Sequence, residues 1–390
     1  MSVNISDIPA REMVGRDTIA RFNAQFRGAA IKSLQILEGG AIDRIYCDFQ
    51  DDFVVRENLS GDKTYHFYQV KTKSKKNHLY TIRELFGLYQ NRGLKSQNSD
   101  DISKSFVGLL LLHAVNFEDS CTTATFQTNI NFDDKTEALI NAIGDVDLQN
   151  KHFVILTGKF RDCFSCPETL KDEDIQSILS KLRFEPGLVY LHPDDTSFPA
   201  LARDAIFKFS EVDLKYAEAK RIIANLVSLV EKKSFSQIIG QVSETELDDA
   251  AGIGLSDLLS ILSISRGAYD QLIAGGDVHA IRNVSIIQRK LGDAGATDEM
   301  VEYASSCKAE WDTWVRKNRH YISELDFNIF LQQLDDVVKK WIGGIVPMSQ
   351  MKPYIDTILS NNREASFGSA LTQNLVLGGL LACVVKSEVQ

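Results

Sequence analysis

The 390-residue chain lacks the features that mark secreted, membrane-spanning or nucleotide-hydrolysing proteins. Residues 1–13 contain no apolar segment of the kind found in a signal peptide. The apolar run 374–385 is interrupted by Gly378 and Gly379 and is too short to span a bilayer. We therefore expect a cytoplasmic protein with no membrane segment, in which this run forms a buried terminal helix or strand.

The six cysteines are scattered, which favours a reducing compartment over a disulfide-bonded extracellular domain. Cys163 and Cys166 form a CxxC pair, but neither a second pair nor an HxxxH follows at zinc-binding spacing, so we interpret the pair as part of a loop. A Gly-rich phosphate loop is also missing, because Gly252 and Gly254 lack the flanking residues of a P-loop or dinucleotide-binding turn. We expect no ATPase within the chain.

Positive charge is scarce overall, since 43 Lys and Arg residues stand against 53 Asp and Glu, for a net charge of -10. Such a balance argues against a protein that coats nucleic acid broadly. The segment from Gln69 to Lys104 is the exception, with eight basic and three acidic residues. It predicts a surface that holds a DNA phosphate backbone, with a solvated loop and helix face as the alternative. The candidate DNA-binding residues are Lys73, Lys75, Lys76 and Arg83.

Two polar residues interrupt an apolar, aromatic strand at 64–72. Because successive strand side chains alternate between faces, Gln69 and Lys71 share one face. Burying an amide and an ammonium is costly unless each finds a partner. This pair therefore predicts a polar site at the end of the strand.

The expected partner lies upstream, where Asp48, Asp51 and Asp52 fall within five residues. Asp52 opens the apolar run 53–55, which is predicted to pair with the strand 64–72 as an antiparallel hairpin. The hairpin would bring Asp52 close to Gln69 and Lys71. Carboxylate and amide oxygens are ligands that Mg²⁺ accepts, with Mn²⁺ as an alternative ion, and a lysine beside them can orient an attacking water.

At Asp52 and at Gln69-Val70-Lys71 the chain resembles the PD-(D/E)xK restriction-endonuclease-like superfamily, in the variant where Gln replaces Glu. Residues 15–17 and 22–26 resemble the first-helix pattern of a narrower group, the CD-NTase-associated endodeoxyribonucleases of bacterial cyclic-oligonucleotide antiphage defence. LmuA, the nuclease subunit of Lamassu defence systems, shows the same pattern. The resemblance covers residues 10–210 and implies Asp52, Gln69 and Lys71 as catalytic residues, with Asp52 and Gln69 holding the metal.

The resemblance further implies that Gln25 and Asp48 face the same site as Asp52. Asp51 competes with Asp52 for the central role, and the spacing alone leaves both open. A solvated carboxylate at a strand end and a helix-capping amide are the ordinary alternatives for Asp48 and Gln25.

The order of predicted elements indicates an α/β core, a central mixed sheet flanked by helices, over residues 1–210, and an all-α domain over 211–390. In the first part we expect helices at 17–38, 135–143 and 172–182, and strands at 42–49, 53–56, 64–72, 106–114, 153–157 and 187–191. Strand signals almost vanish after residue 211. The helical part is interpreted as a platform for partner binding and homo-oligomerisation.

Together these observations predict a metal-dependent DNA endonuclease of antiphage or antiplasmid defence. The cyclic-nucleotide-activated relatives append an α/β sensor domain called SAVED, and the all-helical second half gives little support for one. The resemblance therefore favours the Lamassu-like arrangement, which implies an SMC-like ATPase and a small accessory subunit as partners. Two alternatives stay open: a cyclic-oligonucleotide-activated DNA endonuclease, and a non-catalytic nuclease-fold subunit of a defence complex.

Overall fold

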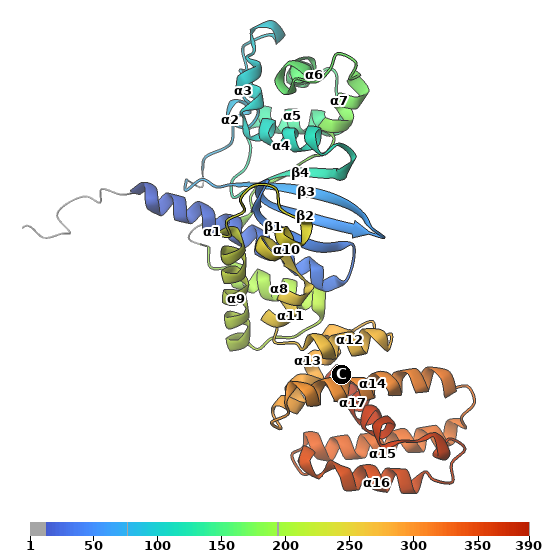
Figure 1. Cartoon of the computed structure of the whole chain (residues 1–390). Helices are drawn as coiled ribbons and strands as arrows, with labels where there is room; N and C mark the ends of the chain where they lie inside the picture. Colours follow the sequence, from blue (N-terminus) through green and yellow to red (C-terminus); the bar gives the residue numbers. More distant parts are fainter. Residues whose placement is uncertain (1–12, 76, 193–194, 390) are drawn as a thin grey trace, which may run out of the picture. The chain divides into compact units, whose positions relative to one another are not determined.

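The computed structural model describes residues 13–75, 77–192 and 195–389 (Figure 1). The chain divides into two compact units. The first, here called the sheet unit, contains the chain up to Ala205 together with Tyr216–Leu255, and the second, the helical unit, contains Ile206–Lys215 and the chain from Ser256 onward. This division does not follow the boundary expected at residue 210, because the segment 216–255 returns to the sheet unit.

The strands of the sheet unit form one mixed sheet in the order β5-β4-β3-β2-β1-β6. β1, β2 and β3 are consecutive antiparallel strands, β4 and β5 extend the sheet in parallel beyond β3, and β6 pairs antiparallel with β1. The strands are β1 (Ile42–Phe49), β2 (Asp51–Leu59), β3 (Asp62–Lys71), β4 (Cys121–Thr128), β5 (Leu182–Glu185) and β6 (Gly252–Gly254). The predicted mixed sheet is confirmed, as are the strands expected at 42–49, 53–56 and 64–72.

Helices surround this sheet and make up the helical unit (Figure 1). They are α1 (Met13–Ser33), α2 (Ile82–Phe86), α3 (Ser99–Ser103), α4 (Phe106–Asn116), α5 (Asp134–Asp145), α6 (Lys151–Phe164), α7 (Asp172–Leu179), α8 (Phe198–Ser210), α9 (Tyr216–Ser234), α10 (Glu244–Ala250), α11 (Leu255–Ile261), α12 (Arg266–Ala274), α13 (Ala280–Gly292), α14 (Asp298–Asn318), α15 (Glu324–Ile342), α16 (Met351–Asn361) and α17 (Gln373–Val389). The helices predicted near 17–38, 135–143 and 172–182 are confirmed.

The two faces of the sheet are covered by α1 and by α4. α1 approaches closely at Gly28, where a Cβ atom would lie 3.2 Å from both the Phe53 ring and the Gln127 side chain. On α4, the ring of Phe106 packs 5.8 Å from that of Phe126. Because Phe126 and Gln127 are consecutive on β4, they point to opposite faces, and so α1 and α4 cover opposite faces.

The strand predicted at 106–114 is wrong, because this segment forms α4. Ser105 caps the helix, its Oγ accepting a hydrogen bond from Gly108 N at 3.0 Å. A continuous apolar run does not distinguish a buried strand from a buried helix, and the burial here has helical spacing. The buried residues are Val107, Gly108, Leu110, Leu111 and Ala114, whereas Leu109 and Leu112 are exposed.

Two further predicted strands are wrong for related reasons. The segment 153–157 lies in α6, which is capped by the Asn150 side chain and buries Phe153, Leu156 and Phe160. The segment 187–191 contains a short 3₁₀ turn at Val189–Leu191, and the strand β5 precedes it. β4 carries four threonines among its eight residues, so its sequence lacks the apolar alternation that would have predicted a strand.

The helical unit has its own core, formed mainly by α14, α15, α16 and α17. Its aromatic centre contains Trp311, Phe330 and Phe367, with the Phe330 and Phe367 rings 5.4 Å apart. α17 passes close to α14, since a Cβ on Gly378 would lie 2.1 Å from the Cys307 carbonyl oxygen. The predicted buried terminal element is thus a helix. In the part of the chain that the structure describes, no helix combines the length and apolar character needed to cross a membrane.

Candidate functional site

One carboxylate at the end of the β2–β3 hairpin receives hydrogen bonds from two layers of the sheet unit. Asp52, the second residue of β2, has a side chain that is 13% exposed. Gln25 Nε2 on α1 donates to Asp52 Oδ1 at 2.6 Å. Asp52 Oδ2 accepts from the main-chain N–H of Val70 at 2.6 Å and from Lys71 Nζ at 3.2 Å. The structure therefore brings Gln25, Asp52 and Lys71 together, and it holds the carboxylate in one orientation.

Gln69 lies two residues before Lys71 on β3, on the same face of the strand, and is 5% exposed. Its Oε1 atom is buried and has no hydrogen-bond partner among the described residues, a property it shares with Gln127 Oε1 on β4. Leaving a buried acceptor unsatisfied costs about 1–3 kcal/mol, so such an atom is expected to meet a ligand or an ordered water. The orphan oxygen beside Lys71 is therefore a candidate ligand atom.

Asp51 has a different set of partners. Its Oδ2 atom lies 3.1 Å from His113 Nε2 on α4, and its Oδ1 atom accepts from the main-chain N–H of Asp52 at 2.9 Å. The His113 ring stacks on Phe67 with centroids 4.4 Å apart. Asp51 thus reaches the site through the backbone of Asp52, whereas Asp52 itself contacts Lys71.

Sequence reasoning missed His113. The residue lies in the segment 106–114 that was expected to be a strand, and it is 62 positions away from Asp51. The helical spacing of the buried leucines in α4 is the signal that would have placed His113 on a helix. No sequence signal pairs it with Asp51, because that contact depends on how α4 packs on the sheet.

Burial raises the pKa of the Asp52 carboxyl, and the neighbouring Asp51 charge acts in the same direction. The Lys71 ammonium and the Val70 N–H oppose this shift without cancelling it. An ionised carboxylate in this position is stabilised further by an additional cation. Carboxyl groups perturbed in this way are found preferentially at functional sites.

Asp48 is not brought into this group. It is exposed, adopts a positive φ of 50° near the β1–β2 turn, and forms no hydrogen bond or ion pair with Asp52, Gln25 or Lys71 in the described residues.

The predicted DNA-binding residues have varied surroundings. The Lys73 ammonium forms an ion pair with Glu84 at 3.2 Å, and its main-chain N–H donates to Asn129. Lys75 and Arg83 are exposed. Lys76 lies outside the described residues.

The donor set at Asp52 and Gln69 fits a magnesium ion. Mg²⁺ takes hard oxygen ligands and is usually bound through one or two carboxylates together with substrate phosphates and water. Among the described residues there is no group of three or more His, Cys, Asp or Glu side chains placed to hold a metal, and the free thiols of Cys163 and Cys166 belong to none.

A second polar cluster of the sheet unit surrounds Arg56 on β2, whose side chain is 4% exposed. Its Nε and Nη2 atoms donate to the two carboxylate oxygens of Asp43 at 2.9 and 2.8 Å. Its Nη1 atom lies 2.6 Å from Tyr46 Oη and 2.7 Å from Glu244 Oε1, and Tyr46 Oη in turn donates to Asp248 at 2.6 Å. Glu244 and Asp248 belong to α10, so this cluster ties α10 to the sheet.

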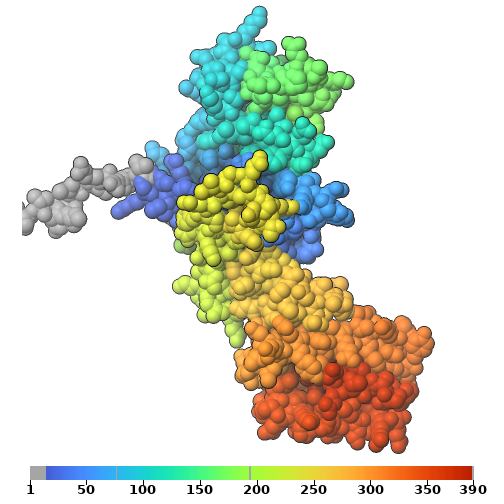
Figure 2. Space-filling view, in the orientation of Figure 1, coloured from blue at the N-terminus to red at the C-terminus, as the bar shows by residue number. Residues whose placement is uncertain are grey.

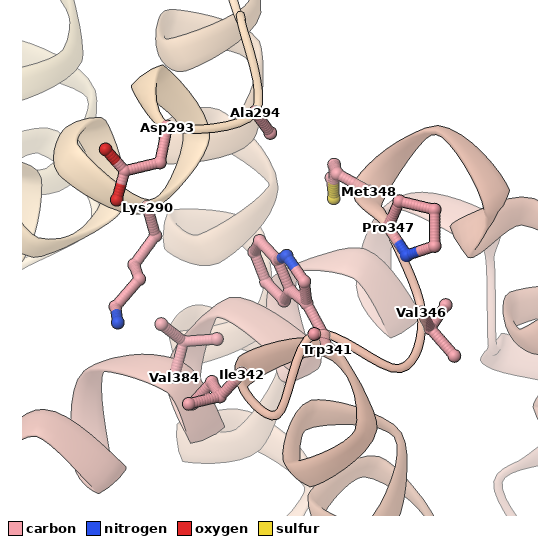
Figure 3. Close-up of a pocket in the computed structure, with 10 residues that line it drawn as sticks. Lys290, Asp293, Ala294, Trp341, Ile342, Val346, Pro347, Met348 and Val384 are labelled. Carbon is pink, nitrogen blue, oxygen red and sulfur yellow. The ribbon is translucent and has the colours of Figure 1, made fainter.

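A concavity of about 330 Å³ occurs within the helical unit. Figure 3 shows the Trp341 indole in the middle of the group, with Lys290 and Asp293 on one side and Pro347 and Met348 on the other. Lys290 is the basic side chain of this lining, and it forms an ion pair with Glu388 at 2.7 Å. The remaining lining is largely apolar, which does not favour a ligand with several phosphates.

The chain was compared with models of known protein families. The family model described as "Cap4, dsDNA endonuclease domain" matches residues 14–234, more than half of the chain. This region contains Gln25, Asp52, Gln69, Lys71 and His113. No curated protein matches the chain.

Among solved structures, the chain is similar to the Acinetobacter baumannii Cap4 SAVED/CARF-domain containing receptor, at 11% identity and a TM-score of 0.37. The alignment covers 61% of this chain and 45% of the receptor. Structures of that receptor with the cyclic trinucleotides 3'3'3'-cAAA and 2'3'3'-cAAA also give 11% identity and a TM-score of 0.37, covering 62% of this chain and 46% and 44% of the receptor. The chain thus spans less than half of the receptor's length, and a TM-score this low does not establish a common fold.

Proposed function

We propose, from the premise that the chain belongs to the Cap4 dsDNA endonuclease domain family, that it is a metal-dependent DNA endonuclease of bacterial antiphage defence. The observation that carries the proposal is the arrangement at the end of the β2–β3 hairpin. Asp52 is oriented there by Gln25 and contacts Lys71, and the buried Gln69 Oε1 has no hydrogen-bond partner among the residues that the structure describes. We assign this arrangement to the PD-(D/E)xK type, with Gln69 in place of the usual acidic residue.

Asp52 and Gln69 would hold a magnesium ion, with manganese as an alternative. When bound, the ion polarises the scissile phosphate as a Lewis acid. The protein's own contribution is positional: Gln25 and the Val70 N–H fix the Asp52 carboxylate, while Asp51 and His113 fix the main chain on which Asp52 stands.

Lys71 has the second chemical role. Its ammonium lies at the partly exposed edge of the site, with its side chain 29% exposed, so it can meet a DNA phosphate. We assign to Lys71 the orientation of the attacking water and the stabilisation of negative charge on the phosphate oxygens. Lys73, Lys75 and Lys76 are assigned to flanking phosphates.

The proposal is tested by incubating the purified full chain with supercoiled plasmid and with linear duplex in Mg²⁺, Mn²⁺ or EDTA. We expect nicking or linearisation in either metal and none in EDTA. Isothermal titration with Mg²⁺ provides a readout independent of cleavage, in which the wild type binds and Asp52→Ala does not. Equal cleavage with and without EDTA would overturn metal dependence, and the absence of cleavage in every condition, candidate activators included, would favour the non-catalytic alternative.

How the cleavage activity is switched on in the cell is a separate prediction. The SMC-like ATPase, the small accessory subunit and homo-oligomerisation are inferred from the resemblance to Lamassu nucleases. The alternative is activation by a cyclic oligonucleotide, which the named A. baumannii receptor is described as binding. The two are separated by titrating cyclic trinucleotides into the full chain and by measuring its mass in solution with and without a candidate ATPase.

A further inference from the structure

A positively charged surface outside the candidate active site is centred on Tyr89, three residues after α2. The Arg83 guanidinium carbon lies 4.6 Å from the centre of the Tyr89 ring, and that of Arg92 lies 3.9 Å from it. Each is within the range of a cation–π contact. One aromatic ring therefore holds two guanidinium groups close together at the protein surface.

The fold adds lysines that the sequence does not place nearby. Lys135 Nζ on α5 donates to Gln90 Oε1 at 2.8 Å, and Lys151 Nζ on α6 donates to the Gln90 carbonyl oxygen at 3.5 Å. The segment with α2 and α3, in blue to cyan, and α6, in green, lie beside each other in Figure 2, and α3 contacts α6. We call the exposed or half-buried residues Arg83, Tyr89, Arg92, Lys95, Lys135 and Lys151 the Tyr89 surface.

The loop that carries this surface is held in one conformation by Gln97, which is 4% exposed. Gln97 Oε1 accepts from Tyr89 N at 2.9 Å, and Gln97 Nε2 donates to the carbonyl oxygens of Tyr89 at 2.8 Å and of Arg92 at 3.1 Å. A loop ordered in advance loses little conformational entropy when a ligand binds. The cations are therefore positioned before any partner arrives.

In the residues that the structure describes, none of the five cationic side chains of the Tyr89 surface forms an ion pair with a carboxylate. Neighbouring cations do: Lys73 is paired with Glu84, and Lys104 with Asp100. Holding like charges together without counter-charges costs free energy that a bound anion would recover.

The spread of the cations favours a polyanion over a single small anion. They come from α2, the loop after it, α5 and α6 rather than converging on one point. The concavity of about 280 Å³ beside Tyr89 is an unfavourable phosphate pocket, because Glu84 and Asp101 line it together with Arg83 and Lys104. Phosphate binding is favoured instead on the exposed side of the surface that carries Arg92, Lys135 and Lys151.

We propose that the Tyr89 surface binds the sugar–phosphate backbone of duplex DNA on one side of the point of cleavage. The inference rests on the proposed function and adds a second contact region on the same substrate. The two regions are connected through the Lys73–Glu84 ion pair, since Lys73 follows Lys71 by two residues and Glu84 is next to Arg83. Substrate affinity then depends on duplex length, because a duplex that covers only the active site does not reach Tyr89.

The test compares Arg92→Glu and the double variant Lys135→Glu/Lys151→Glu with the wild type. The control is Lys232→Glu, at an exposed position of α9 in the same unit. Binding of fluorescent duplexes of about 10 and about 40 base pairs to the full chain is measured by anisotropy in Ca²⁺ over a range of salt concentrations. We expect the charge-reversed variants to bind the long duplex about tenfold more weakly than the wild type. Their slope of log K against log salt should be smaller by about one for each DNA phosphate that the variant no longer neutralises. The short duplex and the control should show neither change.

Two outcomes would overturn the inference: long-duplex affinity and salt slope equal to those of the wild type, or equal losses for both duplexes. Arg92→Gln, which removes charge without reversing it, should give a smaller change in the same direction, and circular dichroism identifies a variant that fails to fold. Failure of the proposed function looks different, because then the wild type itself cuts neither duplex in Mg²⁺.

Discussion

Two polar clusters of the sheet unit are built from similar residues and differ in how completely their members are paired. Around Arg56, the guanidinium donates to Asp43, Tyr46 and Glu244, so each of its three nitrogens has a partner. Around Asp52, the buried Gln69 Oε1 has no hydrogen-bond partner in the described part of the chain, and the pKa of the Asp52 carboxyl group is raised, with burial as the main cause. The Arg56 guanidinium is fully paired within the described residues, whereas the Asp52 cluster keeps a buried acceptor that finds no partner there.

The difference separates a structural network from a site. A fully satisfied buried network specifies one packing arrangement, and here it fastens α10 to β1 and β2. A buried cluster lowers the stability of the isolated chain when one acceptor has no hydrogen bond and a carboxylate has too little neighbouring positive charge. A ligand that supplies the missing hydrogen bond or charge can recover that loss of stability. Substitutions in the two clusters should therefore separate activity from stability.

The largest expected effect is the loss of cleavage in Asp52→Ala and Lys71→Ala. Each removes a group assigned to the chemistry, so we expect the rate of Mg²⁺-dependent plasmid cleavage to fall by about 10²–10³-fold or more. Rates are measured on purified proteins under single-turnover conditions, and thermal melting shows whether each variant is folded. Retained cleavage in both folded variants would sink the site assignment.

The opposite behaviour is expected of Arg56→Ala. Removing this guanidinium leaves Asp43, whose side chain is 35% exposed, without its bidentate partner, and losing such a charge-assisted hydrogen-bonded pair costs about 1.5–3 kcal/mol of stability. Urea unfolding measures the loss, and the cleavage rate per folded molecule should be close to that of the wild type. Lys63→Ala is the matched control, because Lys63 also pairs with Glu244 but is about one-third exposed and should cost less than about 1 kcal/mol. A loss of activity without a loss of stability in Arg56→Ala would contradict the comparison.

A smaller effect is expected at His113. His113→Phe keeps the stacking on Phe67 but removes the hydrogen bond to Asp51, whose carboxylate in turn accepts from the main-chain N–H of Asp52. Removing hydrogen-bonding groups that support a metal site from behind typically costs about 10–100-fold in metal affinity or activity. We expect the Mg²⁺ concentration for half-maximal cleavage to rise by about tenfold while the protein stays folded. His113→Gln, which can still donate a hydrogen bond, should restore part of the loss. Identical Mg²⁺ dependence in the Phe variant and the wild type would show that His113 is only a core residue.

The hairpin that carries the site could be predicted from the sequence because its signals are local. Alternation placed Gln69 and Lys71 on one face of β3, and the short loop after β2 fixed the pairing that brings Asp52 to them. The helical spacing in α1 likewise placed Gln25 on the helix that covers the sheet. Each of these inferences needed only neighbouring residues and one turn.

The parts that could not be predicted depend on packing between distant segments. The sequences of α4 and α6 are apolar enough to resemble buried strands. Their helical form becomes evident only from packing, because residues of both helices and of β4 share one hydrophobic core. β6 adds three residues to the sheet edge after more than a hundred residues of intervening chain. His113 on α4 and Lys135 and Lys151 around Gln90 reach their partners only through these packing choices.

The smallest effect concerns the stability of the metal-free protein and tests the comparison most directly. A carboxyl group whose pKa is raised in the folded chain binds its proton more tightly there than when unfolded, so stability is lost as the pH rises from the ordinary value of 3.8 through the raised pKa. Asp52→Asn resembles the protonated form and escapes this loss. In EDTA, its melting temperature should therefore exceed that of the wild type by a margin that widens between pH 4 and neutral pH.

Adding Mg²⁺ should raise the melting temperature of the wild type and not of Asp52→Asn, because only the wild type gains a counter-charge for its carboxylate. If the wild type is the more stable protein at neutral pH in EDTA, then Asp52 is already fully paired within the chain, and the distinction between the Asp52 and Arg56 clusters fails.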